Sequence, residues 1–396
     1  MVGSAAKGQL SSTSRQMTET LSRHCAWRSV LAGLVLGVIA SGCARTTSAT
    51  PKSFDGESSA LTQTVVVPTL DTPIPQGKSA IWCSSFQLAW NRLKDDLAKG
   101  PVQVKGAQTV ADRLNRALVS EADLDPSAYY AAAGFVKDHI FETIARDMAQ
   151  KFPNAPAFRP VESGADLMAY AYAYLQAGVN YRFPYFDNSD DFVFTDSAGS
   201  GASVHSFGIP PRGAHGGLDT FRGQAEVLFA AKIFHDASRE DFALDLCRFS
   251  EPNQLVLAAV TRKPTLAEAI ASVEGKRSKY QPANEADRRL GIVDVLFVPV
   301  MSWQVTHRFR ELEGLDKTLL NPTLRGGYIA AAQQIIDFQM DRNGAAVKSE
   351  STIAAAGAAG RVLLFNRPFL IMLSKRGAKQ PFSVMWVDNA ELLQKR

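Results

Sequence analysis

Apolar residues recur at intervals of three to four positions in three segments of the first half of the chain. These segments are Phe86 to Leu97, Thr109 to Leu118 and Glu142 to Phe152. The spacing places the apolar side chains on one face of a helix, so we expect three amphipathic helices. Ser84 or Ser85 is expected to cap the first, and Pro153 to end the third.

Strand patterns dominate the second half. Residues 187–217 are rich in Gly, Ser and Asp, which predicts hairpins and loops. Thr265 is expected to cap a further helix, and the remaining apolar runs have the length of strands. These runs are Ala225 to Phe234, Phe242 to Leu246, Gln254 to Val260, Gly291 to Trp303 and Pro381 to Val387. Since helices come first and strands follow, the order predicts an α+β fold rather than alternating βαβ units.

The N-terminal segment has the layout of an export signal. Arg23 and Arg28 precede an apolar run, residues 29–40, that is too short to span a bilayer. The next residues end in Ser41-Gly42-Cys43, and residues 40–43 resemble a bacterial lipobox, in which the cysteine is lipidated. A plain signal peptide with small residues before its cleavage site is the alternative, and Met17 would give a more typical signal length.

We therefore expect three regions: residues 1–42 as a lipoprotein signal peptide, 43–62 as a flexible tether, and 63–396 as one domain. The tether is expected because Ser, Thr and Ala dominate its composition. The protein is expected to be exported, either anchored to the membrane of a bacterial cell envelope through Cys43 or secreted.

Composition and charge narrow the function classes. The chain is 46% hydrophobic and 21% charged, with a formal net charge of +4 that no basic block carries, so nucleic acid is not expected as a partner. No Cys/His cluster has metal-ligand spacing, and we expect neither metal nor cofactor. Outside the signal and Cys43, Cys83 and Cys247 remain. An oxidising envelope would permit a disulfide between them, and two buried free thiols are the alternative.

Two motifs raise other chemistry. His205 and His215 flank a Gly/Pro-rich loop that faintly resembles an esterase segment, but no Gly-x-Ser-x-Gly elbow accompanies them. Asp187 to Asp191 could hold a cation, but the run lacks the glycine and distal Glu of a calcium loop, so a turn is expected there. An enzyme is therefore not expected.

The C-terminal part combines three features. Residues 335–340 form a strand pattern, a small-residue run extends from Gly344 to Gly360, and Leu363 to Leu373 is a buried strand pattern interrupted by Asn366, Arg367, Pro368 and Phe369. Pro368 in such a strand requires a bulge or an edge position. Together these residues resemble the C-terminal signature and the reactive loop of the serpins, a family of serine protease inhibitors.

The resemblance runs from about Ile81 to the end of the chain. It includes residues 180–186, with Tyr181 where serpins usually have Trp, and residues 81–89, with Gln87 replacing a usual Ser. It implies a serpin-like α+β fold: three β-sheets, a helical N-terminal part and an exposed reactive-centre loop. Some family helices are expected to be missing, namely the first helix and the one that lies across the main sheet, between Pro156 and Leu167.

Serpin inhibition, as the resemblance implies, inserts the cleaved loop into the main sheet as a new strand. Alternate residues of a strand share a face. One set after Gly344 is uncharged and comprises Ala345, Val347, Ser349, Ser351, Ile353, Ala355 and Gly357. Lys348 and Glu350 both fall in the other set, so one face of the loop could be buried on insertion.

The resemblance also implies site residues. The hinge corresponds to Gly344, Ala345, Val347 and Ser349, and family spacing from Gly344 places the reactive bond at Ala358-Ala359. Alanine there suits elastase- or subtilisin-like serine proteases, which accept small side chains, whereas Arg361 could attract a trypsin-like enzyme.

The expected partners are a serine protease and, through the lipid, a membrane; the chain is expected to be a monomer. Arg342, where serpins usually have an acidic residue, together with Lys348, Glu350 and Gln87, favours an alternative. In that alternative, the protein keeps the serpin fold but serves as a non-inhibitory binding or structural module of the envelope.

Overall fold

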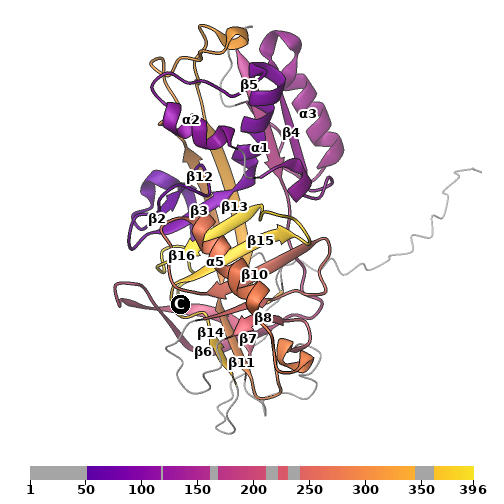
Figure 1. The fold of residues 1–396 in the computed structure, drawn as a ribbon, viewed down its shortest axis with the longest axis vertical. Helices are drawn as coiled ribbons and strands as arrows, with labels where there is room; N and C mark the ends of the chain where they lie inside the picture. The colour runs from indigo at the N-terminus through magenta and orange to yellow at the C-terminus, as the bar shows by residue number, and fades with distance from the viewer. Residues whose placement is uncertain (1–50, 117–118, 161–167, 211–221, 231–240, 344–360) are drawn as a thin grey trace, which may run out of the picture. The chain divides into compact units, whose positions relative to one another are not determined.

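Four β-sheets, of seven, four, three and two strands, make up the β structure of the described residues (Figure 1). The structure is a computed structural model, and it describes residues 51–116, 119–160, 168–210, 222–230, 241–343 and 361–396. All of these belong to one unit, Thr47 to Arg396. The helices are α1 (Ser84–Arg92), α2 (Gln108–Asn115), α3 (Ile140–Lys151) and α5 (Leu266–Lys279), and a π-helical turn, η2 (Leu93–Ala98), continues α1. Among the described residues, no helix is long and apolar enough to cross a membrane.

The largest sheet has seven strands and a continuous apolar core. Its spatial order is β2-β3-β16-β15-β10-β9-β8. The bounds are β2 (Thr64–Val66), β3 (Ser79–Cys83), β16 (Ser383–Val387), β15 (Phe369–Lys375), β10 (Asn253–Ala259), β9 (Phe242–Asp245) and β8 (Glu226–Ala230). Helix α5 contacts β8 and β16, and the Thr265 side chain caps it by accepting a hydrogen bond from the Glu268 amide at 3.2 Å, as the sequence predicts.

The four-stranded sheet has the order β14-β11-β7-β6. Its strands are β14 (Val362–Leu364), β11 (Val295–Pro299), β7 (Gly201–Ile209) and β6 (Phe186–Thr195). Gly208 is required here because a Cβ atom at this position would lie 1.8 Å from the Leu296 carbonyl oxygen of β11.

A three-stranded sheet and a two-stranded sheet complete the β structure. The three-stranded sheet has the order β1-β12-β13, with β1 (Phe54–Glu57), β12 (Met301–Arg308) and β13 (Gln333–Met340). The two-stranded sheet pairs β4 (Tyr129–Phe135) with β5 (Ala169–Leu175), and α3 lies between them in the chain. Short 3₁₀ turns complete the fold: η1 (Ser58–Ala60), η3 (Glu121–Asp123), η4 (Val136–Asp138), η5 (Glu285–Arg288) and η6 (Pro322–Leu324).

The α+β prediction is confirmed, but the predicted tether is wrong for residues 54–60. They form β1 and η1, and β1 pairs in parallel with β12, placing Phe54 beside Trp303. Ser53 supports this strand by donating to the carbonyl oxygens of Ser302 and Leu392, both at 3.0 Å. The composition suggested a tether because the pairing partner lies about 250 positions away and leaves no local signal.

A second correction concerns the cap of α1. The N-cap residue is Cys83, and no side chain caps the helix end. The Ser84 hydroxyl is buried and has no hydrogen-bond partner within the described residues, while Ser85 contacts β13 instead.

Candidate functional site

The candidate site is the boundary between β5 and β13, which we call the seam. Strand β5 pairs only with β4, and β13 pairs only with β12, so within the described residues each has one unpaired edge. Helix α1 contacts both strands, so both lie over the same helix. Burial and the nearby charge of Asp337 on β13 raise the pKa of Tyr174 on β5. Unpaired strand edges accept a further strand, and residues 344–360 follow β13 directly.

Helix α1 lies beneath the seam. Gln334 of β13 is 5% exposed, and its amide nitrogen donates to the Cys83 carbonyl at 2.9 Å and to the Ser85 hydroxyl at 2.8 Å. These bonds tie the edge of β13 to the first turn of α1. Gln334 is not among the residues predicted from the sequence, although a polar residue at an inward position of an alternating strand is a usable signal.

Arg342 is held by two contacts just after the end of β13. The Tyr185 amide donates to the Arg342 carbonyl at 2.7 Å, and the Arg342 guanidinium donates to the Asp187 carboxylate at 2.8 Å. Tyr185 is itself buried, and its hydroxyl donates to the Leu246 carbonyl at 2.8 Å. Its ring meets Tyr181 edge-on with centroids 4.9 Å apart, and burial raises the pKa of both phenols well above their usual value. Arg342, which the sequence marks as a departure from the family, therefore fixes the start of the loop.

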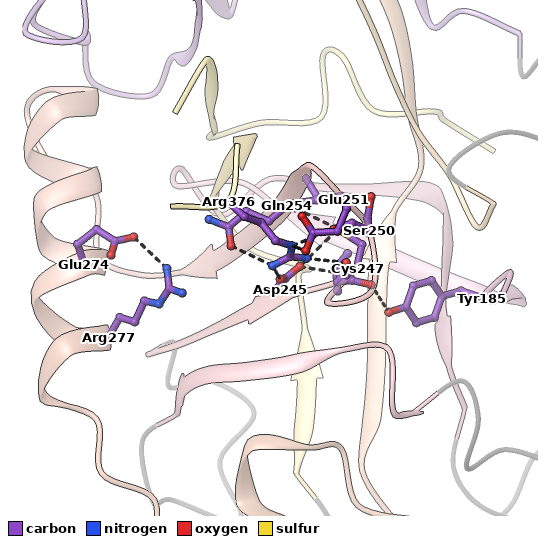
Figure 2. A network of polar contacts seen from close by, with 11 residues as sticks. Tyr185, Asp245, Cys247, Ser250, Glu251, Gln254, Glu274, Arg277 and Arg376 are labelled. Atoms are coloured by element: carbon purple, nitrogen blue, oxygen red, sulfur yellow. Dashed lines mark hydrogen bonds and ion pairs between the residues drawn. The ribbon is translucent and has the colours of Figure 1, made fainter. Parts of the chain in front are cut away.

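A buried ionic network supports Tyr185 from the seven-stranded sheet (Figure 2). The Asp245 carboxylate is 1% exposed and accepts a hydrogen bond from Arg376 at 2.8 Å. Arg376 also donates to the carbonyl oxygens of Cys247 at 2.7 Å and Ser250 at 2.8 Å. A buried carboxylate needs this pairing, so the network holds the β9–β10 turn against the end of β15.

The two cysteines of the domain are free thiols. Cys247 is buried, and its pKa is raised by burial and by the charge of Asp245. Burial likewise raises the pKa of Cys83. Both side chains are therefore protonated, unreactive thiols at neutral pH, which resolves the two alternatives that the sequence leaves open.

The far end of the loop is held by Arg361. Its amide donates to Asp294 at 2.7 Å, and its guanidinium donates to the same carboxylate at 2.9 and 2.6 Å and to the Asp287 carbonyl at 2.9 Å. Asp294 is 4% exposed. The Arg361 guanidinium, which the sequence suggested could attract a trypsin-like protease, is engaged in a largely buried ion pair.

The signature residues occupy a crossover between two sheets. Strand β14 ends at Leu364 in the four-stranded sheet, and β15 begins at Phe369 in the seven-stranded sheet. Pro368 therefore needs neither a bulge nor an edge position, because the chain leaves one sheet before it enters the other. The carbonyl oxygen of Asn366 accepts a hydrogen bond from the Thr195 amide at 2.8 Å, and the Phe369 ring is fully buried. Arg367 is exposed at the crossover.

One face of the two-stranded β4–β5 sheet is covered by a helix, although the sequence predicts that the helix across it is missing. Ile140, Ile144 and Met148 of α3 pack on this face, and the alternation Ala-Tyr-Ala-Tyr-Ala-Tyr in β5 turns its tyrosines to the same side. Helix α1 contacts β4 and β5 as well, and Ala169 and Ala173 pack into the main core. Helix α3 thus lies on this sheet face, and it precedes the segment between Pro156 and Leu167 (Figure 1).

The other candidate chemistry finds little support. Asp187 to Asp191 lie in strand β6, at an irregularity of its pairing with β7, rather than in the predicted turn. Asp187 pairs with Arg342, and no group of His, Cys, Asp and Glu that could hold a metal ion occurs among the described residues. The backbone of His205 lies in β7, and His215 is outside the described part of the chain.

Several predicted residues lie outside the described residues. They are the hinge residues Gly344, Ala345, Val347 and Ser349, the reactive bond Ala358-Ala359, and Cys43. Their roles stay predictions.

No family model and no curated protein matches this chain. The solved structures similar to it include human thyroxine-binding globulin complexed with thyroxine, at 10% identity and a TM-score of 0.45, covering 79% of this chain and 92% of the globulin. They also include a highly specific serpin of the insect Tenebrio molitor, at 10% identity and a TM-score of 0.40, covering 78% and 92%. Human glycosylated kallistatin is a third, at 12% identity and a TM-score of 0.44, covering 79% and 92%. In its fold, this chain is an α+β arrangement of several sheets and few helices.

Proposed function

We propose that this protein inhibits serine proteases of elastase- or subtilisin-like specificity by inserting a cleaved loop into the seam. The observation that carries the proposal is the pair of unpaired edges, on β5 and β13, beside the segment that follows β13. The inhibitor needs no catalytic residue of its own. It needs a loop that can become a strand and a sheet that can receive it.

The chain direction favours insertion. A segment that turns back after β13 runs antiparallel to β13, which allows a regular ladder of backbone hydrogen bonds. On its other side the inserted strand would meet the free edge of β5. Two ladders replace two exposed edges, and this supplies the driving force. The hydrogen bonds of Arg342 with Tyr185 and Asp187 would have to break before the strand could insert.

The alternation of the loop agrees with this sheet. Inward positions of β13, such as Gln334 and Ile336, are buried, whereas its outward positions Ile335, Asp337 and Gln339 are exposed. An inserted strand that turns Lys348 and Glu350 outward would have the solvent-exposed face of β13 on one side and the β5 tyrosines under α3 on the other. The long side chains of Lys348 and Glu350 would extend to the exposed β13 side, which limits the cost of their desolvation.

The proposed specificity follows from Ala358-Ala359. A protease pocket that admits small side chains accepts alanine, whereas the engaged Arg361 offers no free side chain to a trypsin-like pocket. Cleavage near Ala358 would leave the whole run from Ala345 available for insertion.

The test uses elastase with the purified protein and two variants. Wild type should form an SDS-resistant covalent complex cleaved near Ala358. Val347→Arg places a charge in the uncharged set and should convert the inhibitor into a substrate that is nicked without a complex. Thr352→Arg, in the set that already holds Lys348 and Glu350, is the matched control and should still form the complex. If wild type is only nicked, the inhibitory mechanism is wrong.

A second candidate is a non-inhibitory serpin-fold module of the envelope. The contacts of Arg342 with Tyr185 and Asp187 favour it, because they hold the chain just after β13, where an inserting strand would begin. In either case, we propose that the chain is a monomer, exported and anchored through a lipid on Cys43. Labelling with a radioactive fatty acid in a bacterial host, lost in Cys43→Ser, tests the anchor.

A further inference from the structure

Two loops, residues 99–106 and 314–328, are joined by backbone pairing, and we call them the bridged loops. The first follows η2, and the second belongs to the connection between β12 and β13. Val104 pairs with Leu319 in the antiparallel sense, and Thr318 pairs with Tyr328 within the second loop. Backbone hydrogen bonds of 2.8 to 2.9 Å lie beside both pairs. The bridged loops therefore form one shared surface rather than two independent turns.

One face of the bridged loops is buried and the other is exposed. Side chains directly opposite each other in paired strands share a face, and the face alternates along each strand. Val104 and Leu319 point inward, with 0% and 5% of their surface exposed. Their neighbours Lys105, Leu320 and Tyr328 therefore share the outward face. Leu320 is 47% exposed and Tyr328 is 45% exposed, as this alternation requires.

The exposed side of the bridged loops gathers large apolar side chains. Three of the eight that are exposed among the described residues fall within residues 314–328, namely Leu315, Leu320 and Tyr328. Leu315 is the most exposed of the eight, at 75%. A single exposed apolar side chain is ordinary, but a group of them marks an interaction surface. This group is therefore open to a partner.

The charge of the bridged loops is positive. Their basic residues are Lys99, Lys105, Lys317 and Arg325, and their one acidic residue is Asp316. Four positive charges against one negative charge leave a net charge of +3. Lys105 and Arg325 are exposed. A bilayer surface with anionic headgroups suits both properties, because it accepts apolar and tyrosine side chains at its interface and attracts basic ones.

The lipid anchor proposed above would bring such a surface close, and the inference rests on that anchor for the supply of a membrane. Ser53, which leads into β1, follows Cys43 by ten positions. Ten residues extend to at most about 36 Å, so a lipid on Cys43 would keep Ser53 within this distance of a bilayer. A tethered surface meets the bilayer at a high effective concentration, so contacts that are individually weak suffice.

We propose that the bridged loops rest on an anionic phospholipid surface. Leu315, Leu320 and Tyr328 enter the headgroup region, and Lys105 and Arg325 pair with lipid phosphates. The aliphatic stems of these two basic residues lie along the apolar side chains while their charges reach the phosphates. The contact would orient the domain on the membrane to which it is tethered.

A tryptophan introduced by Leu320→Trp reports contact of this face with lipid. The full-length variant is mixed with vesicles of phosphatidylcholine, with or without phosphatidylglycerol, and the wild-type emission spectrum is subtracted. On vesicles with phosphatidylglycerol, we expect the emission to shift to shorter wavelength, because the indole leaves water for the interface. Ile292→Trp is the matched control, since Ile292 is 45% exposed but lies just before β11, and its emission should not shift.

Charge variants test the basic residues in the Leu320→Trp background. Each lysine or arginine near an anionic surface contributes about fivefold to binding. Lys105→Gln and Arg325→Gln should therefore each lower the ratio of shifted to unshifted emission about fivefold.

A shift in Leu320→Trp that needs phosphatidylglycerol, is absent in Ile292→Trp and falls in both glutamine variants supports the proposal. No shift, an equal shift in Ile292→Trp or on phosphatidylcholine alone, or a shift that both glutamine variants leave intact overturns it. A shift that appears without vesicles as the protein concentration rises assigns the face to a second copy of the chain and also overturns it. Fatty-acid labelling of Cys43 and complex formation with elastase are separate readouts, so their failure is distinguishable from failure here.

Discussion

Arg361 offers a sharp test of how the C-terminal end of the loop is held. The change Arg361→Ala removes the guanidinium and leaves the Asp294 carboxylate, 4% exposed, with the backbone amides of Gly291 and residue 361 as its remaining donors. The Arg361 side chain is 21% exposed, so the ion pair contributes less to the free energy of unfolding than a fully buried pair would. Breaking a buried pair on one side costs about 3–5 kcal/mol, and we expect about 2–3 kcal/mol here because of the partial exposure.

The assay is thermal unfolding followed by circular dichroism. Unfolding entropy is about 2.1 cal/mol/K per residue, hence about 0.7 kcal/mol/K for the residues after 50, so the expected drop in Tm is about 3–4 °C. Arg361→Lys keeps the charge but loses the two-pronged contact, and should fall between Arg361→Ala and wild type. Arg310→Ala, at an exposed arginine, should shift Tm by less than about 1 °C.

A double variant separates the ion pair from other effects. Asp294→Asn alone should also destabilise the protein, and combining it with Arg361→Ala should cost clearly less than the sum of the two single changes. Additive losses, or an Arg361→Ala variant as stable as wild type, would refute the assignment of Arg361 as an anchor.

Three further predictions follow from the seam and its neighbours. Burial lowers the pKa of His307 to about 4, against 6.5 for the free side chain, so only the unfolded state takes up the proton between these values. The free energy of unfolding is therefore at its full value above pH 6.5 and falls by at most about 3 kcal/mol towards pH 4. His307→Gln should flatten this pH dependence, measured as the urea midpoint. An unchanged pH dependence in the variant would contradict a lowered pKa of His307. Arg342→Gln should lower stability by up to about 1 kcal/mol at low salt and by nothing measurable at about 1 M NaCl, since the Asp187 side chain is 40% exposed; a loss that persists in high salt would count against an ion pair. Removing residues 51–57 uncovers the edge of β12, so size-exclusion chromatography should show self-association, whereas a monomer with unchanged Tm would show that β1 protects no edge.

The sequence predicted those elements whose signals are local. The helices at residues 84–98, 108–115 and 140–151 follow from apolar spacing, and Thr265 was recognisable as a cap because its partner lies three residues away. The break at Pro368 was visible as well, although its meaning as a crossover between two sheets depended on which strands β14 and β15 join.

The parts that the sequence missed depend on distant partners. Gln334 reaches Cys83 and Ser85 across about 250 positions, and Arg361 reaches Asp294 across 67. Strand β1 looked like a tether because its short polar sequence forms a strand only against β12. Periodicity and composition describe only neighbouring positions in the chain. They do not identify which distant strand or side chain a residue will contact.

Residues 344–360 are proposed to become a strand in the seam between β5 and β13 after cleavage. The most direct measurement is the Tm of the full-length protein before and after a protease cuts within residues 344–360. Insertion adds two ladders of hydrogen bonds, so we expect the cleaved protein to unfold at a higher temperature than the intact one. A cleaved protein that melts at the same temperature or lower would contradict it.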